Sequence, residues 1–135
     1  MEKEVIQPPN VCKPAAPYAP VIKVKGAGSL VFMAGMAPSD IEGKIICHGD
    51  ILGQTRQVVT NIMATLKAAG GRPGDIVMTT TYVIESSMKD FLESGAAVEC
   101  LVSLSNPTDT LVGVATLAGT KNGQLIEITA LAVVD

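Results

Sequence analysis

The strongest constraint on the fold is an amphipathic segment that runs from Asp50 to Ala69. Its apolar side chains recur at intervals of three and four residues, the spacing of one helix face, whereas its polar side chains, Gln54 and Arg56 among them, fall elsewhere. Asp50 can cap the first free amide groups, and Gly70 followed by Pro73 supplies a left-handed exit and a residue that cannot continue a helix. A helix with one apolar stripe needs an apolar surface, so we expect it to cover one face of a sheet.

Runs of β-branched and apolar residues predict the strands of that sheet. Residues 21–25 and 30–34 flank the turn 26–28 and predict one hairpin, and residues 110–117 and 125–134 predict a second. Residues 75–84 are almost uncharged, which is typical of a central strand. Residues 45–46 predict a short strand before the helix. A looser apolar stripe over residues 88–102, with a capping box at Ser87 and a weak point at Gly95, predicts a second helix. Prolines between residues 8 and 20 exclude regular structure there.

The last predicted strand has two mostly apolar faces. Ile126, Ile128 and Ala130 point to one face, while the other face contains a single carboxylate, Glu127. Two helices can cover only one side of the sheet, so we expect the other side to pack against further copies of the chain. A hydrophobic fraction of 47% and a mean hydropathy of +0.38 agree with an apolar subunit interface. We expect a single domain, residues 1–135.

The composition argues against several classes of function. A net charge of -3, no basic cluster and no tryptophan argue against a nucleic-acid partner. No apolar run reaches the length of about eighteen residues that spans a membrane, and the polar amino terminus has no signal-peptide core, so we expect a cytoplasmic protein. Three widely spaced cysteines, Cys12, Cys47 and Cys100, predict reduced thiols, and the single histidine, His48, predicts a surface residue. We expect no metal and no cofactor.

Glu127 and Asp109 are the acidic residues that could carry chemistry. A carboxylate on an otherwise apolar strand face must be paired, hydrogen-bonded or protonated, and such a group is a candidate general acid or base. The alternative, equally open for Glu127, is a place at the solvated sheet edge or a lysine partner. Asp109 precedes a strand and is more typical of a turn or cap. Tyr18, in the proline segment, is typical of an anchor that packs its ring.

Short motifs spread in order along the chain resemble the RidA/YjgF family of imine and enamine deaminases. They are Lys13-Pro14-Ala15-Ala16-Pro17-Tyr18, Leu30-Val31-Phe32-Met33-Ala34-Gly35, Gln54-Thr55-Arg56-Gln57-Val58, residues 75–83, Val112-Gly113-Val114-Ala115 and Ile126-Glu127-Ile128-Thr129-Ala130. The resemblance implies a chorismate-mutase-like α+β fold, a mixed sheet with two helices on one face. It also implies a homotrimer in which the sheets form a central barrel and small molecules bind in clefts between subunits.

The resemblance also implies roles for individual residues. A carboxylate matching Glu127 positions the water that attacks the imine carbon, and a tyrosine matching Tyr18 lines the same cleft with the backbone at Gly35 and its neighbour Ala34. Two further family positions are filled differently, an asparagine by Gly95 and a cysteine by Leu111. These residues form the predicted substrate site, with Glu127 and Asp109 as its catalytic pair.

Asp109 is the main departure from the family pattern, because the family's deaminases carry a substrate-clamping arginine there. A substrate carboxylate about 4 Å from an ionised Asp109 would be repelled by roughly 4 kcal/mol at an effective dielectric near 20. The resemblance extends to deaminases of 2-aminomuconate-type enamines from aromatic ring degradation, which we favour as the substrate class for this predicted hydrolase. The alternative is a non-catalytic trimer that binds a metabolite or protein in the same clefts. A ribonuclease is disfavoured by the acidic charge and the lack of a histidine pair.

Overall fold

The computed structural model describes residues 1–26 and 28–135, and its longest element is helix α1, Ile51–Ala68. Asp50 caps this helix, since its carboxylate accepts a hydrogen bond from the amide of Gly53 at 2.9 Å. Gly70 adopts the left-handed conformation, with φ 81°, just after the helix ends. The predicted helix, its cap and its exit are therefore confirmed.

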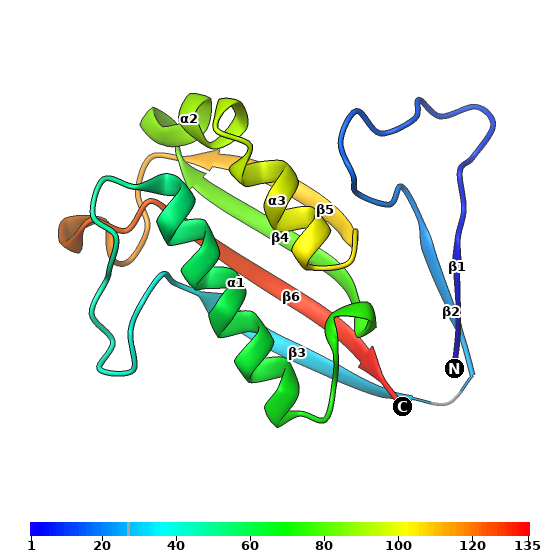
Figure 1. Cartoon of the computed structure of the whole chain (residues 1–135). Helices are drawn as coiled ribbons and strands as arrows, with labels where there is room; N and C mark the ends of the chain where they lie inside the picture. Colours follow the sequence, from blue (N-terminus) through cyan, green and yellow to red (C-terminus); the bar gives the residue numbers. More distant parts are fainter. Residues whose placement is uncertain (27) are drawn as a thin grey trace.

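Four strands form a mixed sheet in the order β3-β6-β4-β5 (Figure 1). They are β3 (Ser29–Met36), β4 (Ile76–Ile84), β5 (Thr108–Val114) and β6 (Ile126–Val134). Strand β6 is antiparallel to both of its neighbours, whereas β4 and β5 are parallel. Strand β4 lies inside the sheet, as its uncharged sequence predicts.

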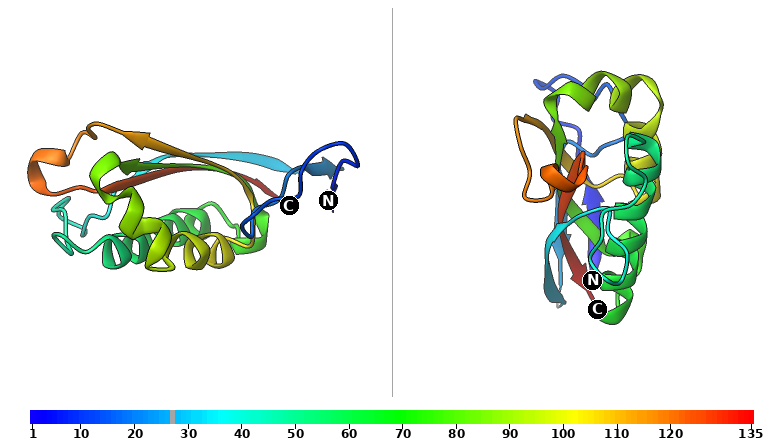
Figure 2. Two further views of the ribbon diagram at one scale, coloured as in Figure 1. Left: turned by 90° about the horizontal axis from the view of Figure 1, so that it is seen from above. Right: turned by 90° about the vertical axis from the view of Figure 1, so that its left-hand side faces the viewer.

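The helices cover one face of this sheet (Figure 2). The predicted second helix is in fact two helices, α2 (Met88–Glu93) and α3 (Ala96–Ser103), because Gly95 adopts φ 84° between them. The capping box predicted at Ser87 is wrong, since the Ser87 side chain makes no capping hydrogen bond. Short 3₁₀ turns occur at Pro73–Asp75, Glu85–Ser87 and Thr120–Asn122.

Both predicted hairpins are wrong. Strand β3 pairs with β6, and β2 (Ile22–Lys25) pairs instead with β1 (Glu2–Val5) in a separate two-stranded sheet; the predicted turn includes Ala27, outside the described residues. Strand β5 pairs with β4 because helices α2 and α3 form the crossover that two parallel strands require. The predicted strand at residues 45–46 is reduced to a single bridge between Ser39 and Ile45.

The segment between β1 and β2 contains no regular element, as its prolines predict. It runs from Ile6 to Val21, and we call it the proline arm. The amide of Ala19 donates a hydrogen bond of 3.0 Å to the carbonyl of Pro107, next to the start of β5. This bond fixes the end of the arm beside the sheet edge.

The core lies between the sheet and the helices. Val58, Ile62 and Leu66 of α1 pack with the inward side chains of β6, and the larger cluster also includes Phe91, Cys100 and Leu104. Gln54 departs from the prediction, because it is fully buried rather than on the polar face. Its amide nitrogen donates to the carbonyls of Cys47 and Gly123, and its oxygen accepts from the amide of Leu125 at 2.8 Å. Gln54 thus fastens α1 to the two loops beside it.

The face of the sheet opposite the helices is open in a single chain. Phe32, with 77% of its surface exposed, and Leu30, with 61%, project from β3, and Phe32 pairs with Leu131 of β6. Met78 of β4, also exposed, lies across from Leu131 on its other side. An apolar row therefore crosses the open face, where the sequence predicts contact with further copies.

Candidate functional site

Asp109 lies near the start of β5, with its side chain on the helix-covered face of the sheet. It pairs in register with Thr79 of β4 and accepts hydrogen bonds from the hydroxyls of Thr79, at 2.7 Å, and Thr81, at 2.9 Å. Both threonines donate to the same carboxylate oxygen, Oδ1. Among residues 1–26 and 28–135, no basic group forms an ion pair with Asp109. The prediction that Asp109 is a turn or capping residue is therefore wrong, because its side chain binds two threonines of the neighbouring strand.

Asp109 lines a cavity of about 90 Å³ between β4, β5, the helices α2 and α3 and the proline arm. Its walls are mostly apolar, and they include Tyr18 and Leu111, two of the predicted substrate-site residues, with Ala16, Phe91, Leu92, Ala97, Cys100 and Leu101. Leu111 is partly exposed. Asp109 is the only carboxylate among the described residues that line this cavity.

Cys100 forms part of the same wall and is only 3% exposed. Burial, followed by the negative charge of Asp109, raises the pKa of the Cys100 thiol to about 12. The thiol therefore stays protonated at neutral pH, which makes it a packing group rather than a nucleophile. Cys12 and Cys47 are exposed, and all three cysteines are free, as predicted.

Glu127 lies on β6, between Ile126 and Ile128, which are both fully buried under the helices. Successive side chains of a strand point to opposite faces, so Glu127 projects onto the open face, where it lies across from Tyr82 of β4. The amide nitrogen of Gln124 lies 3.4 Å from its Oε1. No basic group of the described residues forms an ion pair with it, so the lysine partner considered above is absent there.

Gly35 and Glu127 are in close contact because β3 is irregular between Met33 and Met36, where it passes β6. A Cβ atom at Gly35 would lie 2.7 Å from Oε2 of Glu127. A side chain at position 35 would therefore displace the Glu127 carboxylate from the position that it occupies here. Ala34, beside it, is exposed. The structure thus brings Glu127 and Gly35 together, and Ala34 is the chain neighbour of Gly35.

The predicted site residues form two groups in one chain. Glu127 and Gly35 belong to the open face, whereas Asp109, Leu111 and Tyr18 belong to the helix-side cavity. Gly95 lines neither group and lies at the exposed break between α2 and α3, two residues before Ala97 of the cavity wall. A cleft that contains both carboxylates therefore requires two copies of the chain.

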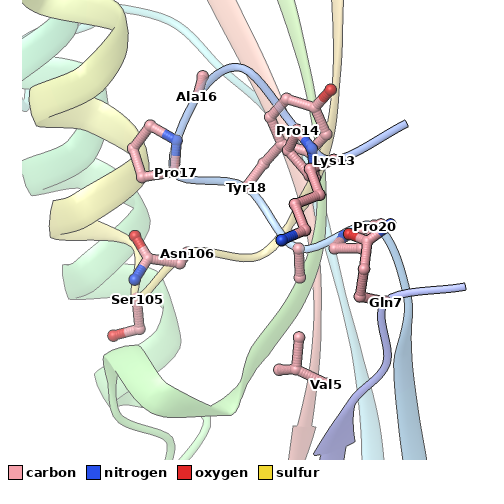
Figure 3. Close-up of a pocket in the computed structure, with 11 residues that line it drawn as sticks. Val5, Gln7, Lys13, Pro14, Ala16, Pro17, Tyr18, Pro20, Ser105 and Asn106 are labelled. Atoms are coloured by element: carbon pink, nitrogen blue, oxygen red, sulfur yellow. The ribbon is translucent and has the colours of Figure 1, made fainter. Parts of the chain in front are cut away.

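A larger cavity, of about 580 Å³, lies between the proline arm and the loop that precedes β5 (Figure 3). It shares Ala16 and Tyr18 with the Asp109 cavity, and its polar lining includes Gln7, Lys13 and Asn106. Figure 3 shows the Lys13 side chain reaching into the space between the arm and this loop. Asn106 and its neighbour Ser105 both adopt positive φ, near 60°, which is uncommon outside glycine.

Sequence patterns do not point to three residues that contact the two carboxylates. Thr79 and Thr81 hold Asp109, and the only available signal was their alternate spacing in a strand that was expected to be central. Gln124, which is buried and contacts Glu127, lies between the predicted turn and the last predicted strand, where no pattern points to it.

The single histidine lies outside both groups of predicted site residues. His48 is exposed, as predicted, and packs against Gly123. The described residues contain no group of three or more histidine, cysteine or acidic side chains placed to hold a metal ion. Within the same residues, no helix has the length and hydropathy needed to cross a membrane.

The chain matches the family model described as Endoribonuclease L-PSP over residues 9–134. It is 39% identical to a RutC family protein of Pyrococcus horikoshii over 130 residues, which cover 96% of this chain and 97% of the relative. A RutC family protein of Pyrococcus abyssi is 36% identical over 132 residues, 98% of each chain.

Solved structures of similar sequence have the same fold as this chain. A member of the Rid protein family from Yersinia pestis superposes with a TM-score of 0.80 at 27% identity, covering 99% of this chain and all of that one. RidA from the Antarctic bacterium Psychrobacter sp. superposes with a TM-score of 0.64 at 26% identity, over 97% and 99% of the two chains. The sequence and the fold together show that the chain belongs to the endoribonuclease L-PSP family, which includes the Rid proteins.

Proposed function

We propose that the protein is a hydrolytic deaminase of reactive imines or enamines, with Glu127 as the residue that directs water. Members of this family are generally imine or enamine deaminases or related proteins. The observation that carries the proposal is the position of Glu127. It is a partly buried carboxylate without a basic partner in the described residues, beside a glycine that leaves space for it. A carboxylate in this setting can accept a proton from water.

The proposed reaction needs no group beyond the substrate, water and the two carboxylates. An enamine first takes a proton on carbon to give a protonated imine. Water then adds to the imine carbon and gives a proton to Glu127, and that proton passes to nitrogen. The tetrahedral adduct then expels this nitrogen as the carbonyl forms, and the hydroxyl proton of the adduct passes to the departing nitrogen, which leaves as ammonium. Asp109 is proposed to act as the partner or proton donor in these transfers.

We further propose that the active cleft lies between copies of the chain in a homotrimer whose sheets form a central barrel. Two observations support this arrangement. The two carboxylates belong to opposite faces of one sheet, and the open face exposes an apolar row that includes Phe32 and Leu30. Burial of such a row between copies would provide a favourable interface. The cytoplasmic location remains a prediction from the sequence.

For the substrate we propose a 2-aminomuconate-type conjugated enamine. Such a molecule carries carboxylates, and Lys13 lines the arm cavity that adjoins the Asp109 cavity at Tyr18. A lysine there could bind a substrate carboxylate at a distance from the negative charge of Asp109. Residues Tyr18, Leu111, Gly35, Ala34 and Gly95 remain the proposed substrate-site residues.

Ammonia release tests this proposal. Freshly generated 2-aminomuconate and 2-aminoacrylate are incubated with the wild type, with Glu127→Gln and with Glu93→Gln, a control at an exposed glutamate of α2. We expect turnover of 2-aminomuconate that is reduced at least about 100-fold by Glu127→Gln and unchanged in the control. Turnover that survives in Glu127→Gln contradicts the role of Glu127. No turnover of either compound supports instead the non-catalytic trimer that binds a metabolite or protein.

A further inference from the structure

The Asp109 carboxylate has one oxygen that is fully engaged and one that is not. Thr79 and Thr81 both donate to Oδ1, at 2.7 and 2.9 Å, and no donor from the described residues contacts Oδ2. The two hydroxyls are short, buried side chains of β4, so they hold the carboxylate in one orientation. An ionised carboxylate has room for about four hydrogen bonds, and two of them remain available here.

The surroundings of Asp109 provide no positive charge. No lysine, arginine or histidine lines the cavity, no ion pair to Asp109 is present in residues 1–26 and 28–135, and the neighbouring thiol of Cys100 is neutral. A partly desolvated carboxylate among apolar side chains favours any ligand that supplies a positive charge or N–H donors. The same charge repels an anionic group in this cavity.

The cavity also limits the size of the group that can enter. Its volume of about 90 Å³ corresponds to roughly three water molecules. This space accepts a small planar group, and the flat ring of Tyr18 and the side chains of Phe91 and Leu101 form the walls against which such a group would lie. A protonated imine, with its N–H groups in one plane, has both the required charge and the required shape.

We infer that Asp109 is a specificity-determining residue that binds the protonated nitrogen end of the substrate through Oδ2. This inference rests on the proposed function and deepens it, because it fixes the orientation of the substrate. The iminium or ammonium group enters the Asp109 cavity, and any carboxylate of the substrate lies outside it. A substrate whose carboxylates can lie outside this cavity, toward Lys13 of the arm cavity, is therefore preferred.

Three small molecules of almost one shape test the inference without turnover. Acetamidinium is cationic and planar, acetamide is its neutral counterpart and acetate is its anionic counterpart. Each is titrated into the protein while the NMR amide signals of Ala97, Cys100 and Leu111, which line the cavity, are followed. We expect saturable shifts with acetamidinium, binding at least about tenfold weaker with acetamide, and none with acetate.

Variants assign the effect to Asp109. Asp109→Asn keeps the shape of the side chain and should weaken acetamidinium binding at least about tenfold, so that acetamidinium and acetamide bind alike. Asp90→Asn, at an exposed aspartate of α2, should leave the preference unchanged. Equal binding of acetamidinium and acetamide to the wild type, or a preference that survives Asp109→Asn, overturns the inference. Cation binding without ammonia release would contradict the proposed reaction alone, and ammonia release without cation preference would contradict this inference alone.

Discussion

Glu127 and Asp109 project from opposite faces of the same sheet, on strands β6 and β5 that lie on either side of β4. Glu127 lies across from Tyr82, whereas Asp109 is bound by Thr79 and Thr81 beneath the helices. Within one chain the two carboxylates cannot approach one reacting atom. Any mechanism that uses both must therefore combine the open face of one copy with the cavity of another.

The contact between Gly35 and Glu127 gives a first prediction. Gly35→Ala places a methyl group 2.7 Å from Oε2 of Glu127, so the carboxylate must move. Gly35 does not need a positive φ, and we therefore expect a folded variant with ammonia release reduced at least about tenfold. Gly74→Ala is the matched control, because a Cβ there meets no atom within 4 Å. Full activity in Gly35→Ala would show that the position of Glu127 is not critical.

Gln54 gives a prediction about stability. Gln54→Leu keeps the volume of the side chain but leaves the amide of Leu125 and the carbonyls of Gly123 and Cys47 without their partner. We expect a loss of about 2–4 kcal/mol in the free energy of unfolding, measured by urea denaturation. Thr60→Val, on the exposed side of the same helix, should change it by less than about 0.5 kcal/mol. Similar stabilities for the two variants would refute the structural role of Gln54.

Local sequence signals predicted the elements whose structure depends on near neighbours. The period of α1, the capping of that helix by Asp50 and the uncharged run of β4 all correspond to what the structure contains. The hairpin predictions failed because strand pairing depends on distant partners. Strand β3 pairs with β6, almost a hundred residues later in the chain, and β5 pairs with β4 across the crossover of α2 and α3.

In the candidate site, too, local patterns were informative and contacts between distant residues were not predictable. The alternation of β6 predicted that Glu127 would be the carboxylate of the second face, and the structure places it there. The hydroxyls that hold Asp109 come from a strand that is about thirty residues away in sequence, so spacing alone could not reveal them. Gln54 lay at a polar position of the helical pattern, yet the loops beside α1 require its amide.

Cys100 gives a prediction about pH. Its raised pKa of about 12 means that the folded state favours the protonated thiol, so this stabilisation is complete below about pH 9 and is lost as pH rises toward 12. At pH 8.5, iodoacetamide should modify Cys12 and Cys47 and leave Cys100 unmodified, as read by peptide mass spectrometry. Between pH 8 and 11, Cys100→Ala should lose less stability than the wild type. Rapid alkylation of Cys100 in the folded protein would contradict its burial.

The open face gives a prediction about assembly. Phe32→Asp places a charge in the exposed apolar row, and we expect it to convert a trimer into monomers in light-scattering measurements. Ile41→Asp is the control, because Ile41 is 99% exposed in a loop outside the sheet. A trimer that persists in Phe32→Asp would show that this row does not join the subunits.

Subunit complementation tests the central claim most directly. Glu127→Gln and Asp109→Ala are each expected to be inactive toward the best substrate, and the two variants are mixed, unfolded and refolded together. If each active cleft combines Glu127 of one copy with Asp109 of the next, random trimers regain about a quarter of the wild-type ammonia release, since one cleft in four receives both intact residues. Mixed trimers, verified by mass, that release no more ammonia than the separate variants would contradict a cleft shared between subunits.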